Sequence, residues 1–498
     1  MKPIENIAIV GGGTAGWIAA AILSNQFSKG ECRIELVESD QIGTIGVGES
    51  TIPPFMELLA NLGIDEKDFI RKTQASFKLG ISFENWRTGS DKYFHPFGVI
   101  TAGMNEYNFY QLWLKSNMLG EARQLQDYSP SSMMASQNKF ILPQLVTGTP
   151  LADTRYALHL DASLVTKYLK EYAMARGVVR TEGKVISVSQ TKSGDIASVE
   201  LESGERIPAE FFIDCTGFNS LILDKTLKVE YEDWTHYLPC DRAVTVQTTS
   251  EGPTPPYTRA IAKDAGWMWK IPLQKRTGNG YVYSSRFCSD DQAKQTLLEG
   301  VSGQALIEPR VIPFKTGKRK QIWHKNCLGL GLAAGFIEPL ESTALHLVVR
   351  GMFYLMRSFP DTSCSPILQA EYNRRVQMDY EEIRDFIVLH YCLTERDDTA
   401  FWRYCRDITL PDSLQYSLDF FKENGGIPEG VDLLFAPISW RSVCEGLGVR
   451  PRRPSPLIDE FDYSKAVATI DSFKVAMDTM IQRLPSHDRF IQDNCAVD

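Results

Sequence analysis

A glycine-rich turn near the start of the chain is the feature that most constrains its fold. The residues GGGTAG at positions 11–16 fit the pattern G-x-G-x-x-G and follow directly on the apolar segment 6–10. Hydrophobic periodicity predicts a strand over residues 6–10, a helix over about 15–27 and a second strand over 33–37. This order of strand, glycine turn, helix and strand indicates an α/β dinucleotide-binding unit.

The residues of this turn have separate tasks in such a unit. Gly11 permits the tight turn, Gly13 lets the backbone approach a pyrophosphate, and Gly16 lets the helix pack on the strand. The helix start at Thr14 and Ala15 presents N–H groups and the positive end of the helix dipole to phosphates. We therefore predict that these five residues bind a dinucleotide. A tight turn with nothing bound is the alternative.

Glu38 ends the second strand, where a carboxylate takes the ribose hydroxyls of a dinucleotide. Two further features favour FAD over NAD. The glycine pattern is not repeated, as a separate NAD domain would require. A later apolar strand, predicted over 209–214, ends in Cys215-Thr216-Gly217. This ending resembles the second FAD motif of flavoenzymes, in which a late strand returns to the cofactor.

Composition excludes several other classes of protein. The net charge of −9 over 498 residues argues against a nucleic-acid partner. The ten cysteines form no Cys-x-x-Cys pair, so neither a metal site nor a disulfide framework is expected. No run reaches the ~18 apolar residues of a membrane span. A cytoplasmic protein without a membrane partner is the expectation.

The order of predicted elements suggests the domain organisation. Short alternating segments at 185–189, 196–201 and 206–207 predict an antiparallel ribbon, and the periodicity becomes helical beyond about 365. We expect a Rossmann-like FAD-binding body over 1–360 with interleaved substrate-site segments. A mainly helical C-terminal part over 361–498 is expected to pack with it as one unit.

Four further segments carry a family resemblance. GWMWKIP at 266–272 matches a W-x-W-x-I-P signature, and SFKLG at 76–80, IEPLEST at 337–343 and GVGEST at 46–51 accompany it. Together they resemble the flavin-dependent tryptophan halogenase family, from the first strand to about residue 451. The resemblance implies a flavoprotein monooxygenase-type fold that uses FADH2, oxygen and a chloride or bromide ion to form hypohalous acid. It also implies a separate flavin reductase and a small, electron-rich aromatic substrate of indole type, and it leaves a homodimer open.

The resemblance assigns two catalytic residues. Lys78 would receive hypohalous acid, either by hydrogen bonding or as a haloamine, and the alternative is an ordinary surface lysine. Glu341 would stabilise the cationic ring intermediate and remove its proton, whereas the alternative is a carboxylate at the start of a helix over 342–350, where Ser342 or Thr343 could also cap. The amides of Thr343 and Ala344 would hold the halide. Ala344 replaces the family's usual glycine, and its methyl group favours bromide over chloride.

The remaining family positions concern the cofactor and the substrate. Gly48, Glu49 and Ser50 lie in the second glycine turn against the flavin, and Leu332 lies in a late motif, GLAA at 331–334. Trp267 and Trp269 would separate the flavin from the substrate, so that only a small molecule such as hypohalous acid passes. As an alternative, they are two core aromatics on one face of a strand. The residues assigned to substrate contact are His95, Phe97 and Trp440; a packed or surface histidine is the alternative for His95.

Two other functions compete with the halogenase. An FAD-dependent aromatic hydroxylase usually has Gly-Asp-Ala at the late FAD motif, and the GLAA of this chain has no acid. A flavin-binding protein without catalysis would have no reason to keep Lys78, Glu341 and both tryptophans. The mass of the product distinguishes the three, because bromine replaces hydrogen in one case, oxygen is added in the second, and nothing changes in the third.

The single nucleotide fingerprint leads to a prediction about reduced flavin. The purified protein with NADH and FAD alone should give almost no halogenated product, and an unrelated flavin reductase should restore it. The measurement is product formation by mass spectrometry with and without the reductase. Efficient halogenation from NADH, with contaminating reductases excluded, would contradict the expectation.

Overall fold

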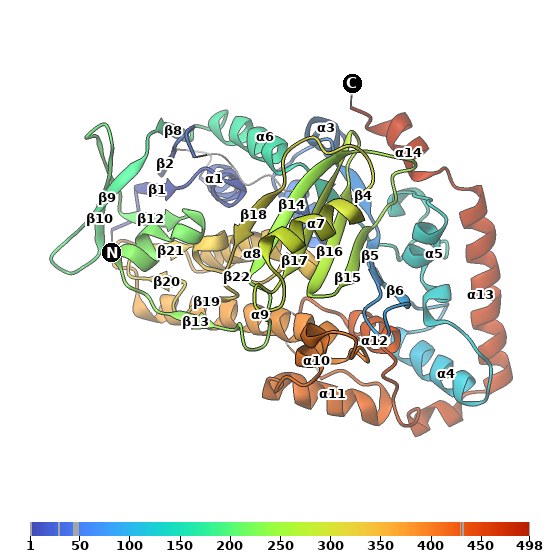
Figure 1. Cartoon of the computed structure of the whole chain (residues 1–498). Coiled ribbons are helices and arrows are strands. Elements are labelled where there is room, and N and C mark those ends of the chain that lie inside the picture. Colours follow the sequence, from blue (N-terminus) through green and yellow to red (C-terminus); the bar gives the residue numbers. More distant parts are fainter. Residues whose placement is uncertain (1, 28–29, 43–48, 429, 431–432, 498) are drawn as a thin grey trace. The chain divides into compact units, whose positions relative to one another are not determined.

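A computed structural model describes residues 2–27, 30–42, 49–428, 430 and 433–497 (Figure 1). The chain divides into two compact units, each assembled from three segments. Unit 1 comprises Met1–Thr73, Leu160–Asp241 and Pro313–Glu381, and unit 2 comprises Gln74–His159, Arg242–Ile312 and Glu382–Asp498.

The centre of unit 1 is a six-stranded sheet in the order β20-β21-β12-β1-β2-β8. Strand β1 pairs in parallel with both β2 and β12, and only β20 runs antiparallel to its neighbour. Parallel strands covered on both faces are apolar throughout, as β1 is. The strands are β1 (Asn6–Val10), β2 (Arg33–Glu38), β8 (Val179–Glu182), β12 (Phe211–Asp214), β20 (Trp323–His324) and β21 (Cys327–Gly329).

Helix α1 (Thr14–Gln26) is the buried helix of unit 1. Ten of its residues are buried, because a helix that is apolar all round can lie only inside a protein. It packs against α6 and α8. The helices of this unit are α1, α2 (Pro54–Asn61), α3 (Glu66–Thr73), α6 (Ala162–Met174), α8 (Ala344–Arg357) and the first part of α9 (Pro366–Cys392), with the short turns η3 (Gly217–Asn219), η4 (Leu221–Thr226), η5 (Gly331–Ala333) and η6 (Pro339–Glu341).

Two small antiparallel sheets complete unit 1. The predicted ribbon is confirmed as β9 (Val185–Gln190), β10 (Ile196–Leu201) and β11 (Arg206–Pro208). The second sheet has the order β13-β19-β22. Its strands are β13 (Tyr231–Asp233), β19 (Gly317–Arg319) and β22 (Gly335–Phe336), and the two-residue strand β3 (Glu49–Ser50) also belongs to this unit.

Unit 2 is built on a seven-stranded, mostly antiparallel sheet in the order β18-β14-β17-β16-β15-β5-β6. Next to β5 in the chain, β4 pairs antiparallel with β7. The strands are β4 (Ser76–Lys78), β5 (Gly80–Glu84), β6 (Lys92–Pro96), β7 (Ala157–Leu160), β14 (Arg242–Thr249), β15 (Thr258–Lys263), β16 (Gly266–Pro272), β17 (Arg276–Tyr283) and β18 (Arg310–Pro313).

The helices of unit 2 surround this sheet. Helix α7 packs on β14 and β17, and α12 packs on β6 (Figure 1). They are α4 (Glu106–Met118), α5 (Pro130–Ser136), α7 (Asp290–Gly300), α10 (Ala400–Arg406), α11 (Asp412–Asn424), α12 (Pro437–Gly446), α13 (Tyr463–Arg483) and α14 (His487–Asn494), with η1 (Leu125–Tyr128), η2 (Pro143–Leu145) and η7 (Pro456–Glu460).

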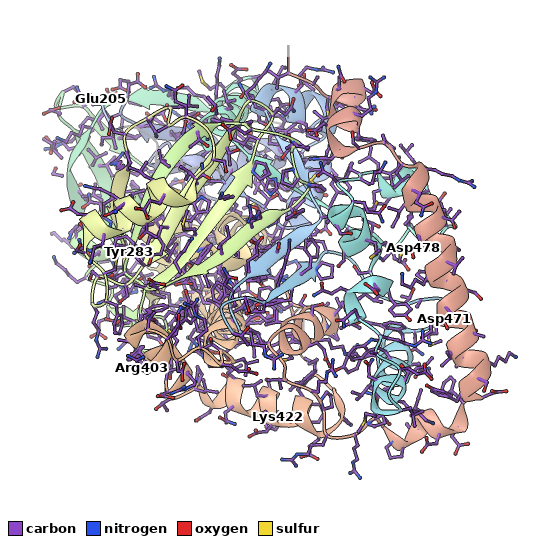
Figure 2. The ribbon with its side chains drawn as sticks, turned by 45° about the vertical axis from the view of Figure 1, so that its right-hand side comes forward. Glu205, Tyr283, Arg403, Lys422, Asp471 and Asp478 are labelled. Carbon is purple, nitrogen blue, oxygen red and sulfur yellow. The ribbon has the colours of Figure 1, made fainter. Side chains whose placement is uncertain are left out.

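The long helix α13 is attached to α4 and its following loop. Asp471, labelled on α13 with Asp478 in Figure 2, forms an ion pair with Arg123, which also donates to the Tyr128 hydroxyl. From this anchor the chain continues to Pro485 and then to α14, the last helix. Helix α13 is therefore attached to the loop after α4 before the chain reaches α14.

Most of the elements predicted from the sequence are confirmed. The first strand has the expected bounds, and α1 and β2 each differ from the prediction by one residue. The mixed α/β class and the helical character beyond residue 365 are also confirmed. The compact units do not follow the division at residue 360, because the largest sheet of each unit is assembled from segments far apart in the sequence. No helix in the described ranges is long and apolar enough to cross a membrane.

The pairing of β16 with β17 leads to a stability prediction. Trp269 lies opposite Gly280, and a Cβ on Gly280 would come within 2.1 Å of the indole ring. Gly280→Ala should therefore lower the free energy of unfolding by about 1–3 kcal/mol, the usual range for overpacking. Denaturant unfolding measures it. In a Trp269→Leu background the same change should cost much less, and equal costs in both backgrounds would contradict the steric explanation.

Candidate functional site

The glycine turn of unit 1 requires glycine for steric reasons. Gly11 has φ +113°, and a Cβ on it would lie 2.2 Å from the carbonyl oxygen of Cys215 at the end of β12. A Cβ on Gly16 would lie 2.0 Å from the carbonyl oxygen of Gly11. Both contacts are with backbone atoms, which cannot move aside without disturbing the sheet. The turn is thus locked between β1, α1 and β12.

The end of β12 is itself held by a buried carboxylate. Asp214 accepts hydrogen bonds from the amide and hydroxyl of Thr216 and from the amides of Ile222 and Leu223, at 2.6–3.0 Å. Four donors satisfy a carboxylate that has no contact with solvent. From the sequence, Asp214 was only the last residue of a predicted strand. In the structure its carboxylate holds the residues that follow β12 by hydrogen bonds.

The start of α1 is open toward the position that a phosphate would take. Gly13 is the N-cap residue, no side chain caps the helix, and a Cβ on Gly13 would meet nothing within 4 Å among the described atoms. The first turn, which includes Thr14 and Ala15, contains no acidic residue. The helix therefore presents unsatisfied amides and the positive end of its dipole, which suits an anion.

Glu38 ends β2 beside the glycine turn and is bound by two cations. Its carboxylate accepts from Arg180 at 2.5 Å, from Lys170 at 2.9 Å and from the indole of Trp17 at 3.2 Å. Burial raises the pKa of Glu38, but these hydrogen bonds outweigh burial and the pKa is lowered overall. Gly12 leaves the space that the carboxylate fills, since a Cβ there would overlap it. Sequence reasoning missed Arg180 and Lys170, because they belong to β8 and α6.

Glu49 follows the second glycine turn. Its Oε2 is buried and has no hydrogen-bond partner among the described atoms. Burial, together with the nearby charge of Asp161, raises the pKa of Glu49 to about 7. A buried carboxylate oxygen without a partner suits a ligand that donates a hydrogen bond. Ser50 lies beside Glu49 in β3, and Gly48 lies outside the described residues.

These features fit a flavin dinucleotide. The late motif adds a close approach of Gly331 to α1, because a Cβ on Gly331 would lie 2.9 Å from that of Ala15. Leu332 follows within η5 and is partly exposed. An open helix start, a carboxylate at the end of the second strand and an unpartnered buried acid therefore occur in one unit. The donor set is that of a phosphate-bearing, hydrogen-bonding cofactor.

The segment with Glu341 forms a tight turn before α8. Glu341 is buried, with 1% of its surface exposed, and ends η6. Ser342 adopts the left-handed conformation (φ 61°, ψ 34°) and Thr343 a right-handed one (φ −90°, ψ −7°). When one residue is left-handed and the next right-handed, their backbone amides point toward the same concave side. This arrangement is called a nest, and it suits anions. The nest ends with the amide of Ala344, the first residue of α8.

The helix in this segment differs from the prediction at both ends. It begins at Ala344 and ends at Arg357, whereas residues 342–350 were expected. Thr343 is the N-cap residue, but its side chain makes no capping hydrogen bond. The left-handed turn at Ser342 delays the helix, because a residue in that conformation cannot belong to a right-handed helix. The sequence suggested that Ser342 or Thr343 could cap this helix with its side chain. For Thr343 this suggestion was wrong.

Lys78 lies in unit 2 and is fully buried on β4, with 0% of its surface exposed. Its ammonium lies 5.0 Å from the centroid of the Phe97 ring, a cation–π distance. The amide of Phe97 donates to the carbonyl of Leu79 at 2.8 Å, which holds that ring beside the lysine. An ordinary surface lysine, the alternative from the sequence, is therefore wrong.

The three predicted substrate residues lie in one aromatic cluster of unit 2. The ring of His95 lies 6.4 Å from Phe97 and 5.6 Å from Phe386, and Phe386 lies 5.5 Å from Trp440. Phe435 stacks on Phe386 at 3.8 Å. All five are buried. Sequence reasoning missed the central role of Phe386, since on a 27-residue helix rich in aromatics nothing distinguishes it.

The two tryptophans of β16 are also buried. Their rings are 6.1 Å apart at 53°, and Trp267 lies 6.5 Å from Trp86. The indole N–H of Trp269 has no hydrogen-bond partner among the described atoms. Unit 2 thus contains Lys78, the aromatic cluster and this pair, whereas the nucleotide turn, Glu341 and the backbone nest belong to unit 1.

Two buried histidines of unit 2, neither of them predicted, contact β4. His159 lies 3.0 Å from the hydroxyl of Ser76 and 2.9 Å from that of Thr258. Burial lowers its pKa, and the charges of Lys78 and His487 lower it further. Burial also lowers the pKa of His487, to about 4. Both imidazoles are therefore neutral at physiological pH, and the charge of Lys78 contributes to the lowered pKa of His159.

Comparison with known proteins agrees with this arrangement. The model of a family described as tryptophan halogenase matches residues 6–463. The chain is 32% identical to tryptophan 7-halogenase RebH of Lentzea aerocolonigenes over 98% of each chain. Its structure is similar to Xcc4156, a flavin-dependent halogenase from Xanthomonas campestris, with a TM-score of 0.95, 42% identity and coverage of 100% and 99% of the two chains. It is also similar to the flavin-dependent halogenase BrvH from Brevundimonas sp. BAL3, with a TM-score of 0.94, 37% identity and coverage of 98% and 99%.

The family match spans far more than half of the chain, and the relatives align with it from end to end. The glycine turn, the lysine segment, the paired tryptophans and the segment around Glu341 all fall within the matched residues. The chain therefore belongs to the tryptophan halogenase family and is a flavin-dependent halogenase.

Proposed function

We propose that this enzyme uses FADH2, oxygen and a halide to form hypohalous acid, and that it halogenates an electron-rich, indole-type ring beside Lys78. The observation that carries the proposal is the ammonium of Lys78, fully buried and in contact with an aromatic ring of the cluster around Phe386. Burying an ammonium costs several kcal/mol. A residue with a purely structural task at this position would not need the charge.

The cofactor-binding residues in this proposal are those of unit 1. Gly11, Gly13 and Gly16 shape the turn, the amides at Thr14 and Ala15 receive the phosphates, and Glu38 receives the ribose. Glu49, Ser50 and Leu332 would line the flavin, and Gly48, which the family resemblance also assigns to the cofactor, lies outside the described residues. When bound and reduced, the flavin would supply the two electrons with which oxygen oxidises a halide ion to hypohalous acid.

The backbone nest at Ser342–Thr343 is the proposed halide site. Amides of Thr343 and Ala344 that converge on one side would hold an anion without a positively charged side chain. A site of this kind would hold a halide ion by backbone hydrogen bonds alone. The methyl group of Ala344 leaves its amide in place, as the proposed halide site requires.

Lys78 and Glu341 divide the chemistry of ring substitution between them. The ammonium of Lys78 would hydrogen-bond the oxygen of hypohalous acid and give it a proton, so that a ring carbon attacks the halogen while the oxygen leaves as water. If the amine is neutral, it would instead form a nitrogen–halogen bond and release water, and the haloamine would transfer the halogen. In either route Glu341 would take the proton that the ring loses, and a halogen atom replaces a hydrogen atom overall.

The aromatic pair Trp267 and Trp269 is the proposed barrier between the flavin and the organic substrate. The two indoles are buried side by side on one face of a strand, and their bulk would keep a ring-sized molecule away from the flavin. Reduced flavin would come from a separate reductase, since the chain has one nucleotide fingerprint.

The aromatic cluster favours a small uncharged ring. Near Trp440, the guanidinium of Arg441 is committed to Glu106 at 3.0 Å. The carboxylate of Glu382 accepts from the amides of Leu434 and Phe435. Each of these two charges already has a partner among the described residues, so we expect it to be less available to the ammonium or carboxylate of an amino acid. Free tryptophan would bury these groups without partners, which is unfavourable.

The assignment of Lys78 predicts a separation of two activities. Lys78→Met should lower halogenation of the organic substrate by about 10²–10⁴-fold, because the halogen donor loses its polarising group. Flavin oxidation and hypohalous acid formation should remain nearly unchanged. Stopped-flow absorbance and product mass spectrometry measure the two. Lys92→Met, on an exposed lysine of β6, is the control. More than a tenth of the wild-type halogenation in Lys78→Met would show that the assignment is wrong.

The lining of the cluster predicts the order of substrates. With equal concentrations of indole and tryptophan, indole should be halogenated at least about tenfold faster. The reason is that tryptophan would have to bury its ammonium and carboxylate without partners. Competition assays in bromide and in chloride measure the ratio. 3-Methylindole, which has a substituent at the same carbon but no charge, should behave like indole. Faster turnover of tryptophan would mean that other residues bind its charged ends.

A further inference from the structure

The strand that carries Lys78 is short. Strand β4 has three residues, Ser76, Phe77 and Lys78, all fully or nearly fully buried. A strand of this length has few ladder hydrogen bonds of its own, so contacts from outside the sheet decide where its side chains point. The register places Phe77 opposite Leu158 of β7.

One such contact comes from the last helix of the chain. The amide of Phe77 donates to Nε2 of His487 at 3.2 Å, across 410 residues of sequence. The Nδ1 of the same ring lies 2.8 Å from the carbonyl oxygen of Thr254. A carbonyl only accepts, so Nδ1 carries the proton and Nε2 has the lone pair that receives the amide. Both contacts are possible only in this one neutral tautomer.

The surroundings keep the imidazole in this state. His487 is fully buried, and its ring lies 6.0 Å from that of Phe77 and 5.8 Å from that of Phe140. A proton on Nε2 would destroy the acceptor for Phe77. Burial lowers the pKa of His487 to about 4, which removes that proton at any pH near neutrality.

The start of α14 is itself fixed. The amide of His487 donates to the carbonyl of Asn138 at 2.8 Å, and the side chain of Asp488 accepts from the amide of Thr254 at 3.1 Å. One turn later, Phe490 contacts the ring of Phe77 edge-on at 5.5 Å. The imidazole thus approaches β4 from a rigid support.

We propose that His487 is a positioning residue for Lys78: its neutral imidazole holds the backbone of Phe77 and so fixes the direction of the neighbouring lysine. The inference rests on the proposed function of Lys78. Without the acceptor, the amide of Phe77 would be buried and unsatisfied, and β4 would shift to find another partner. A shift of this kind moves the ammonium away from the halogen acceptor, and displacements of about 1 Å cost about 10²-fold in rate.

Two amide variants separate the two contacts of the ring. His487→Gln places an oxygen near the position of Nε2 and keeps an acceptor for Phe77, but it loses the donor to Thr254. His487→Asn places a nitrogen near the position of Nδ1 and keeps that donor, but it loses the acceptor. Asp488→Asn disturbs the docking of α14 on Thr254 without touching β4. If His487→Asn does not fold, His487→Leu, which has no acceptor, takes its place.

The experiment measures halogenated indole formed per FADH2 oxidised, in the full-length protein with an added reductase. His487→Asn should lower this ratio by about 10- to 100-fold, whereas His487→Gln and Asp488→Asn should stay within about threefold of the wild type. Hydrogen exchange at the amide of Phe77, followed by mass spectrometry, should be at least about tenfold faster in His487→Asn alone. This second measurement does not depend on activity.

Two results would overturn the inference. Equal ratios for His487→Asn and His487→Gln, with Lys78→Met inactive, would show that His487 does not position the lysine while the proposed function stands. Full halogenation by Lys78→Met would show instead that the function assigned to the lysine is wrong, and the positioning role would fall with it.

Discussion

The buried ammonium of Lys78 is the constraint around which unit 2 is arranged. A charge removed from water is tolerated only where the surrounding groups compensate it. The face of the Phe97 ring provides part of this compensation. Burial and the charge of Lys78 lower the pKa of His159, so this imidazole adds no second positive charge beside the lysine at neutral pH. The same apolar packing that surrounds the lysine therefore also sets the charge state of this histidine.

Unit 1 depends on a different constraint, the close approach of backbone to backbone. The glycine turn contacts the end of β12 so tightly that no side chain fits at Gly11 or Gly16. The carboxylate of Asp214 holds the other side of this contact with four hydrogen bonds. A rigid turn leaves the start of α1 open to an anion. In the same unit, Ser342 has a left-handed and Thr343 a right-handed conformation, so the backbone alone turns successive amides toward one side.

Several residues of the site were not predictable from the sequence. Arg180 and Lys170 hold Glu38, yet each is an ordinary basic residue on its own strand or helix. Phe386 lies at the centre of the aromatic cluster, and His487 contacts β4 from the far end of the chain. In each case the partner is distant in sequence, so no local pattern marks the residue. The assignments of Lys78, Glu341 and the substrate contacts came from the resemblance and not from periodicity.

The sequence by itself determined the local elements and the chemistry of the turn. Glycine spacing, apolar periodicity and the acid at the end of the second strand are properties of neighbouring residues, and short-range sterics and hydrogen bonding decide them. Tertiary structure alone decided which elements share a unit, that Lys78 is buried, and that Glu49 retains an oxygen without a partner among the described atoms. Burial and charge state arise from atoms that the chain brings together across hundreds of residues, and these long-range contacts leave no periodic trace in the sequence.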